Sequence, residues 1–244
     1  MNRLYNAILF YSRLPVPKGV KCDPETLSQS LRYFPLIGIM VGVIGYGGYW
    51  LTNMILPHNI SVIAAMVAMV LTTGALHEDG FADFCDGFGG GYTKESILRI
   101  MKDSHIGTYG VIGLIMMLLT RYTMLTSFDS ESMAVVLILA QSASRFAPVA
   151  MTRLSTYARN EPSKSSHSAL GIDMSGVVVA MLFALLPLVI VGWKITTCYI
   201  LIMSILFILF RRYIHRHIEG FTGDTLGALQ QIGEVIFYAI LLAL

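Results

Sequence analysis

Apolar runs long enough to cross a lipid bilayer as helices recur along almost the whole chain of 244 residues. A hydrocarbon core of about 30 Å requires roughly 20 predominantly apolar residues in a helix. Only 13% of the residues are charged, against roughly 25% in an ordinary soluble domain. The sequence therefore predicts an all-α fold, a polytopic integral membrane bundle.

The apolar runs predict six or seven transmembrane helices in one membrane domain, residues 1–244. We place them at 34–56, 60–76, 107–127, 133–150, 175–192, 197–210 and 232–244. The last two runs are short for a full crossing. Gly38 and Gly42 form a GxxxG pattern in the first span, which predicts close packing against another helix.

Residues 1–33 precede the first span and lack the features of a secretory signal, because Pro15 and Pro17 interrupt the apolar stretch early. We expect them to stay attached as an N-terminal interfacial segment. An ordinary cap of the bundle is the alternative.

The cysteines and the basic residues exclude two other kinds of site. Cys22, Cys85 and Cys198 show neither paired nor metal-ligand spacing, so we expect them to be reduced and structural. No basic stripe interleaved with aromatic residues occurs, and we therefore expect no nucleic acid partner.

The distribution of basic residues predicts which side each connection faces. With a cytoplasmic N-terminus, 14 of the 17 lysines and arginines lie in cytoplasmic segments, and only Lys194 lies in an outside connection. This asymmetry favours a multi-pass protein of the cytoplasmic (inner) membrane with its N-terminus inside. The three longest polar connections after the N-terminal segment then share the cytoplasmic face. They are 77–105, 151–174 and 211–231.

Four carboxylates crowd the stretch HEDGFADFCDGFGGG at 77–91, and no lysine or arginine follows before Lys94. A helix continuing from the second span through residue 86 would place Asp79, Asp83 and Asp86 on one stripe. Like charges at this spacing repel each other. Mg²⁺ would relieve the repulsion, because it binds carboxylate oxygens and shares its shell with water and phosphates. A solvated acidic loop is the alternative.

The residues that follow the acids predict the rest of a cytoplasmic acidic catalytic loop or helix over 77–105. Gly89 and Gly90 belong to a glycine run that we expect to form a hinge, where backbone N–H groups could approach a phosphate. A flexible turn is the alternative. Lys102 could hold a phosphate as a point charge, and Asp103 could add a ligand or accept a proton.

The later connections carry matching residues. Asp224 lies in a glycine- and threonine-rich turn before the final helix, where a ligand could approach closely or a helix cap could form. Arg145 lies in or near the end of the fourth span, where an arginine usually faces a polar cavity or a partner. Arg153 and Arg159 could meet diphosphate oxygens or anionic lipid headgroups.

Six segments spread over most of the chain form a specific pattern: SRLPVP at 12–17, YFPLIGIMVG at 33–42, GALHEDGFADFCDG at 74–87, IMKDSHIGTYG at 100–110, SR at 144–145 and GDTLGA at 223–228. In order and approximate spacing they resemble the cobalamin 5′-phosphate synthases, also called adenosylcobinamide-GDP ribazoletransferases. Two positions depart from the family pattern. Glu78 stands where the family usually has an apolar residue, commonly leucine, and His105 stands where arginine is usual.

The resemblance implies a reaction in the last steps of cobalamin nucleotide-loop assembly. The cobinamide-phosphate part of adenosylcobinamide-GDP would be transferred to α-ribazole or its 5′-phosphate, with Mg²⁺ required and GMP released. The implied ligands of one or two Mg²⁺ ions are Asp79, Asp83 and Asp86. Asp103 and Asp224 would complete the metal shell or act as general base. The expected substrate contacts are Lys102, Arg145, Gly89, Gly90, Thr222 and Gly223.

Two other functions use similar residues. CDP-alcohol phosphotransferases also place several aspartates at a membrane face, but their sequence pattern is not reproduced here. A cation- or proton-coupled transporter usually needs acids distributed through its spans, whereas here only Asp129, Glu131 and Glu234 lie outside the cytoplasmic segments. The expected partners are the substrates and the lipid bilayer. A homo-oligomer, or association with other enzymes of nucleotide-loop assembly, is compatible with this interpretation.

Overall fold

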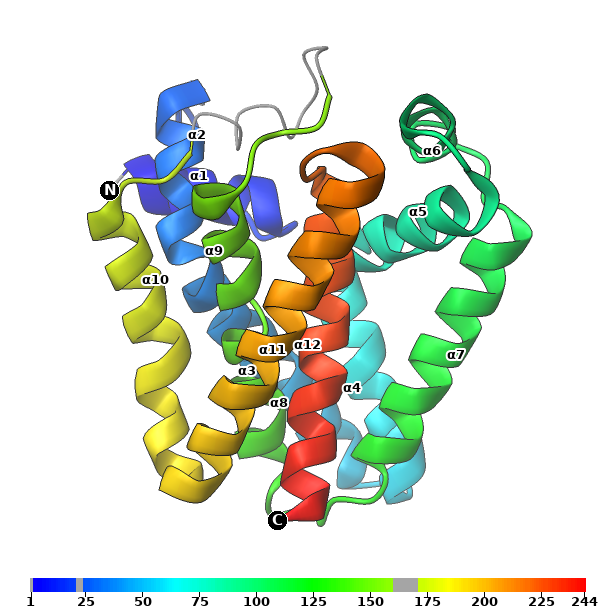
Figure 1. The fold of residues 1–244 in the computed structure, drawn as a ribbon. Coiled ribbons are helices and arrows are strands. Elements are labelled where there is room, and N and C mark those ends of the chain that lie inside the picture. The colour runs from blue at the N-terminus through cyan, green and yellow to red at the C-terminus, as the bar shows by residue number, and fades with distance from the viewer. Residues whose placement is uncertain (1, 21–23, 160–170) are drawn as a thin grey trace.

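The structure is a computed structural model that describes residues 2–20, 24–159 and 171–244, and these residues form a helical bundle (Figure 1). The helices are α1 (Asn2–Tyr11), α2 (Pro24–Ser30), η1 (Leu31–Tyr33), α3 (Phe34–Asn53), α4 (His58–Thr73), α5 (Leu76–Gly90), α6 (Lys94–Ile100), α7 (Thr108–Leu125), α8 (Met133–Ala143), α9 (Phe146–Leu154), α10 (Met174–Leu185), η3 (Leu186–Val191), α11 (Trp193–Ile218) and α12 (Gly223–Ala243). No β-strand occurs in these described ranges. The predicted all-α polytopic bundle is confirmed.

Six helical segments are long and apolar enough to cross a membrane, and a seventh crossing is possible if α4 and α5 form one bent span. The six are Glu25–Asn53, Thr108–Leu125, Met133–Leu154, Met174–Val191, Trp193–Ile218 and Gly223–Ala243. The predicted count of six or seven is therefore confirmed.

The last two runs, which are short for a full crossing in the sequence, belong to longer helices, so that prediction was wrong. Helix α11 has 26 residues and α12 has 21, so both are longer than the runs at 197–210 and 232–244. Hydropathy missed the first half of α12 because its polar side chains Gln230 and Gln231 are buried inside the bundle. Helix α4, with 16 residues, is shorter than both α11 and α12.

A break separates α4 from α5, so the expected continuous helix through residue 86 was also wrong. The two helices meet at 87°, and the turn places Gly74 and Ala75 in the left-handed region at φ 66° and 59°. Figure 1 shows α5 lying across the upper end of the bundle instead of along it. The N-terminal segment supports the break, since the Arg13 backbone N–H donates to the Thr72 carbonyl at 2.7 Å.

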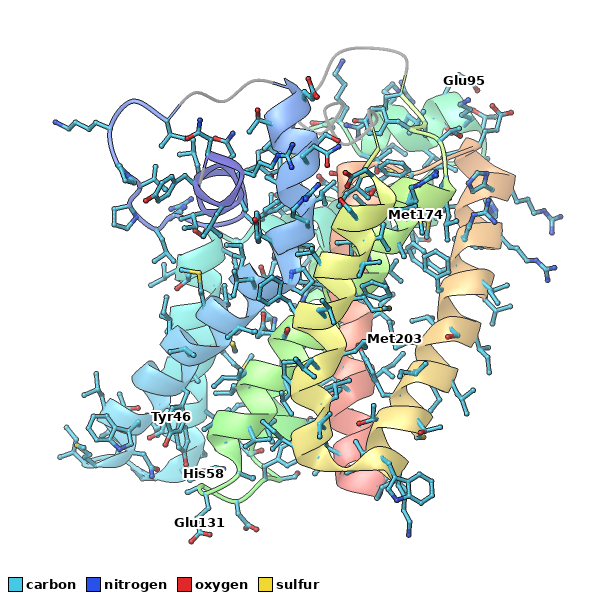
Figure 2. All side chains as sticks on the ribbon, turned by 90° about the vertical axis from the view of Figure 1, so that its left-hand side faces the viewer. Tyr46, His58, Glu95, Glu131, Met174 and Met203 are labelled. Atoms are coloured by element: carbon cyan, nitrogen blue, oxygen red, sulfur yellow. The ribbon has the colours of Figure 1, made fainter. Side chains whose placement is uncertain are left out.

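Polar connections that are distant in sequence meet at this end of the bundle. The Ala158 N–H donates to the Phe221 carbonyl at 2.9 Å, and the Phe221 N–H donates to the Thr156 carbonyl at 2.9 Å. In Figure 2, Glu95 marks this end, and His58 and Glu131 mark the opposite end. The predicted convergence of the three connections is confirmed for their described parts. Cys85 and Cys198 are free, as expected; Cys22 lies outside the described residues.

Glycines allow α3 to pack directly on the backbone of α8. A Cβ atom built on Gly42 would lie 2.6 Å from the Ile138 Cα and 2.8 Å from the Leu137 carbonyl oxygen. Gly38 lies equally close to the carbonyl of Gln141. The GxxxG pattern therefore serves helix packing, as predicted.

We predict that Gly42→Ala destabilises the bundle by about 1–3 kcal/mol, the usual range for inserting a methyl group into a well-packed contact. Gly47→Ala on the same helix is the matched control, because a Cβ there would meet no atom within 4 Å. Thermal unfolding of the detergent-purified variants would measure the difference. Equal unfolding temperatures for Gly42→Ala and Gly47→Ala would show that the α3–α8 contact is looser than described.

Candidate active site

An acidic pocket of about 450 Å³ lies at the end of the bundle that carries α5 and α6. It is lined by Ala75, Glu78, Asp79, Ala82, Asp83, Met101, Lys102, Asp103, Ser104, Ile106 and Leu114. The α4–α5 break turns Asp79 and Asp83 toward the α6–α7 connection, which supplies Lys102 and Asp103. Four of the predicted site residues are thus brought together.

The acids of this pocket differ in their partners. Among the described residues, the carboxylates of Asp79 and Asp83 have no hydrogen-bond or ion-pair partner. Asp103 instead accepts the backbone N–H of His105 at 3.0 Å, and the His105 Nδ1 lies 2.7 Å from the same oxygen. These hydrogen bonds lower the pKa of Asp103 from its ordinary value, so its carboxylate stays ionised at neutral pH. His105 therefore contacts the site through Asp103.

Glycines bring Asp224 against α5. A Cβ built on Gly80 would lie 3.0 Å from the Asp224 Cα, and one built on Gly227 would lie 3.5 Å from the Gly80 Cα. Helices α5 and α12 therefore cross at backbone contact, which places the first turn of α12 beside the acids of α5. Asp224 does not line the acidic pocket itself.

An arginine from the α9–α10 connection neutralises Asp224. The Arg159 Nη2 donates to the Asp224 Oδ2 at 2.8 Å and to the Met101 carbonyl at 3.4 Å. Met101 lines the acidic pocket, so the Arg159 guanidinium lies next to it. The sequence shows no basic residue close to Asp224, but folding brings Arg159 to it from 65 positions away. The sequence indicates Arg159 only as a phosphate or lipid contact.

Asp86 is separated from the other two acids of α5 by its hydrogen bonds. It is buried and accepts the backbone N–H groups of Gly107 at 2.7 Å and Gly110 at 2.8 Å. It therefore caps the N-terminus of α7, where a carboxylate is favourable. A Cβ on either glycine would collide with the Asp86 carboxylate. The expected three-acid stripe thus contributes two acids to the pocket.

The glycine run is helical, so the expected hinge was wrong. Gly89 and Gly90 lie in the last turn of α5, which ends at the extended residue Gly91. Gly89 packs against the ring of Tyr109, where a Cβ would lie 2.6 Å from the ring carbon Cγ. Neither glycine lines the acidic pocket.

The GFTGD segment forms a helix cap, the alternative kept open from the sequence. Thr222 accepts the Thr225 N–H at 3.2 Å, and Thr225 Oγ1 accepts the Thr222 N–H at 2.9 Å. Gly223 is the first residue of α12, so Asp224 lies in the first helical turn instead of a preceding loop. The Thr222 hydroxyl also donates to the Asp224 Oδ2 at 3.3 Å.

A buried ionic network that the sequence did not predict lies beneath the pocket. The Arg121 guanidinium contacts the Glu78 Oε1 at 3.1 Å, the Glu234 Oε1 at 2.9 Å and the Gln231 Oε1 at 3.2 Å. Tyr238 donates to Glu234 at 2.8 Å. Arg121 on α7 therefore binds α5 and α12 at once. The sequence carries one indication of this network: Arg121 and Glu234 have opposite charges and lie in two different predicted spans.

Arg145 lies in this buried region, away from the acidic pocket. It is 1% exposed, and its Nη1 donates to the Gln141 carbonyl and Oε1, both at 2.6 Å. Its guanidinium carbon lies 5.4 Å from the centre of the Phe34 ring. An arginine facing a polar interior was expected here and is found, but Arg145 is not among the residues that line the acidic pocket.

The donor set of the pocket consists of hard oxygen ligands. Within the described ranges, no group of three His, Cys, Asp or Glu side chains is arranged to hold a metal ion by itself. Mg²⁺ does not require such a cage, because it is usually held by one or two carboxylates together with water and substrate phosphates. Asp79 and Asp83 fit that pattern.

Fold and site together define a polytopic helical membrane protein with an acidic pocket at one end of its bundle. A model of the cobalamin-5-phosphate synthase family matches residues 3–242. The chain belongs to this family.

Several relatives are similar over nearly their whole length. A Vibrio cholerae protein named adenosylcobinamide-GDP ribazoletransferase is 42% identical over 239 residues, which cover 97% of this chain and 92% of the relative. Proteins of the same name from Shewanella oneidensis and Shewanella frigidimarina are each 38% identical, and cover 97% and 100% of this chain and 92% and 95% of the relatives. No solved structure matches the chain.

We predict that Arg121→Leu lowers the stability of the bundle by about 3–5 kcal/mol, because Glu78 and Glu234 would remain buried without their cation. Adding Glu234→Gln to that variant should recover part of the loss. Arg212→Leu, at an exposed position of α11, should change stability by less than about 0.5 kcal/mol. Thermal unfolding in detergent measures all three. An Arg121→Leu variant as stable as Arg212→Leu would contradict the role of the network.

Proposed function

We propose that this chain is a Mg²⁺-dependent membrane transferase, an adenosylcobinamide-GDP ribazoletransferase. It transfers the cobinamide-phosphate part of adenosylcobinamide-GDP to α-ribazole or α-ribazole 5′-phosphate and releases GMP. The names of the relatives and the family membership support the substrates. The observation that carries the chemistry is that Asp79 and Asp83, without partners among the described residues, meet Lys102 and Asp103 in one pocket.

The reaction joins a ribose hydroxyl of the acceptor to a phosphorus of the diphosphate, and the bond to GMP breaks. Transfer of a phosphoryl group depends mainly on positioning and on neutralising charge. Lys102 lies in the pocket wall, where it can hold diphosphate oxygens as a point charge. We assign a second cationic contact to Arg159 in place of Arg145, because Arg159 lies beside the pocket whereas Arg145 is enclosed.

We assign metal binding, proton acceptance and helix positioning to the carboxylates. Asp79 and Asp83 would hold Mg²⁺, which when bound supplies Lewis-acid neutralisation of the diphosphate charge. Asp103 or Asp224 accepts the proton of the attacking hydroxyl, or completes the ligand set. Asp86 has both oxygens engaged by backbone N–H groups, so we propose a positioning role in which it fixes α7 against α5.

We further propose that the acidic pocket faces the cytoplasm, in the inner membrane. The basic residues at this end of the bundle support the orientation through the positive-inside rule. A soluble, charged nucleotide-linked donor and a GMP product would then enter and leave on the cytoplasmic side.

The two competing functions make different demands. A CDP-alcohol phosphotransferase would accept CDP-diacylglycerol, so a panel of donors separates it from the proposed enzyme. A transporter would move Mg²⁺ or protons across vesicles without consuming a donor. The buried carboxylate Glu234 is neutralised by Arg121, which argues against it as a cation carrier.

We predict that Asp83→Asn lowers turnover by at least about 100-fold, the scale for a group that stabilises transition-state charge. The fold should persist, because the substitution removes one of several repelling charges. Purified protein would be incubated with adenosylcobinamide-GDP, α-ribazole 5′-phosphate and Mg²⁺, and the joined corrinoid and GMP would be quantified by chromatography.

Asp129→Asn is the matched control, because Asp129 is exposed and follows α7, at the end opposite the acidic pocket. It should retain full turnover, and chelation of Mg²⁺ should stop both the control and the wild type. A wild-type protein that forms no joined corrinoid would end the assignment. An active Asp83→Asn variant would remove this residue from the metal site and leave the substrate assignment intact.

We predict opposite labelling of two cysteines introduced into a cysteine-free variant. Lys194→Cys, at the end opposite the pocket, should react with a membrane-impermeant maleimide in intact cells. Glu95→Cys, at the pocket end, should react only after the membrane is permeabilised. The reverse pattern would place the acidic pocket outside the cytoplasm.

A further inference from the structure

A second cavity has a volume of about 470 Å³. It lies on one side of α11, and the helices of the acidic pocket lie on the other side. It lies between α9, α10 and α11, and we call it the apolar cleft. Figure 2 shows two of its lining residues, Met174 at the upper end of α10 and Met203 about midway down the bundle. Its volume is in the range of ordinary ligand pockets, roughly 300–1,000 Å³.

Small side chains line the bottom of the cleft, and larger apolar side chains line its sides. Ala143, Ala147 and Ala150 line it at helical spacing, so this face of α8 and α9 leaves a groove. Leu185 and Phe207 line its walls from α10 and α11. A groove of this kind within the spans faces lipid, because few side chains of α10 and α11 are buried in the bundle and most of the exposed ones are apolar.

The length of the cleft corresponds to one leaflet of a bilayer. Its lining runs along α10 from Met174 to Leu185, which spans about 17 Å at 1.5 Å per residue. One leaflet contributes about 15 Å, half of a hydrocarbon core of roughly 30 Å. An acyl chain that lies along the cleft would therefore reach from the membrane surface to the midplane.

The upper mouth of the cleft is cationic. Arg153, near the end of α9, lines the cleft and is exposed. The Arg211 Nε of α11 donates to the Ser155 Oγ at 3.0 Å, which places a second guanidinium next to the same mouth. Arginine side chains bind phosphate in charge-assisted, often bidentate, hydrogen bonds.

We propose that the apolar cleft binds one anionic phospholipid, with an acyl chain between α10 and α11 and the phosphate against Arg153. The charged group of the lining, Arg153, lies at the end where a headgroup would lie, and the rest of the lining is mainly hydrocarbon, with the hydroxyls of Tyr199 and Ser204 as its other polar groups. Basic pockets between transmembrane helices bind anionic headgroups in this way. The site is separate from the acidic pocket and does not depend on the proposed enzymatic activity.

Native mass spectrometry of the full chain tests this proposal. The purified protein would be stripped of lipid and titrated with phosphatidylglycerol or with phosphatidylcholine of the same acyl chains. We expect one tightly bound phosphatidylglycerol, and weaker binding of phosphatidylcholine. Arg153→Gln should reduce the preference for phosphatidylglycerol about fivefold, the effect of one basic residue beside an anionic lipid.

Two variants would fill the cleft from different walls. Ala150→Phe and Ser204→Phe should each remove the bound lipid, and Ser204 is exposed on α11, so that its replacement does not disturb a packed core. Ile205→Phe is the matched control, because Ile205 is a neighbouring exposed residue that does not line the cleft. Arg212→Gln is the control for charge.

The outcomes distinguish one lipid bound in the cleft from lipid that only surrounds the bundle. Loss of the single lipid in the filling variants, with retention in Ile205→Phe, supports the cleft. Equal retention by all variants, or equal binding of the two phospholipids, overturns the proposal and shows annular lipid only. If Ala150→Phe unfolds, Ser204→Phe and Arg153→Gln still decide the question.

Discussion

One buried cation, Arg121, joins α5, which carries most acids of the pocket, to α7 and α12. Its guanidinium is 1% exposed and ties Glu78 on α5 to Glu234 on α12 from its own place on α7. These three helices carry or adjoin the residues of the acidic pocket. In a protein interior such a pair is costly to break, because removing one partner leaves a buried charge without compensation. Glu78 is the α5 member of this pairing.

Close backbone contacts between helices add to the ion pairs in holding the bundle together. Gly80 and Gly227 let α5 and α12 cross without side chains between them, and Gly42 does the same for α3 and α8. Association of helices inside a membrane relies on such contacts, because lipid is as apolar as the helix surfaces themselves. The crossing of α5 and α12 is the step that brings Asp224 beside the acid cluster. Packing and charge thus act on the same pair of helices.

The class of fold and the acidic half of the site followed from the sequence, because apolar length and clustered carboxylates are local signals. Asp79, Asp83, Lys102 and Asp103 share one pocket, in agreement with the predicted acidic loop or helix over 77–105. The break after Gly74 was missed because a left-handed turn at Ala75 has no strong sequence signature. Partners distant in sequence, such as Arg159 with Asp224 and Arg121 with Glu234, were invisible since only folding defines them.

The carboxylates fall into two groups: those with a partner hold helices together, and those without a partner face the acidic pocket. Glu78 and Glu234 have Arg121, Asp224 has Arg159, and Asp86 has two backbone N–H groups. In the described part of the chain, Asp79 and Asp83 alone among the acids of α5 have neither kind of partner. A buried carboxylate must be compensated, whereas one at the wall of an open pocket can remain hydrated until a cation and a phosphate arrive. The fold therefore neutralises the acids that hold helices together and leaves uncompensated those that face the pocket.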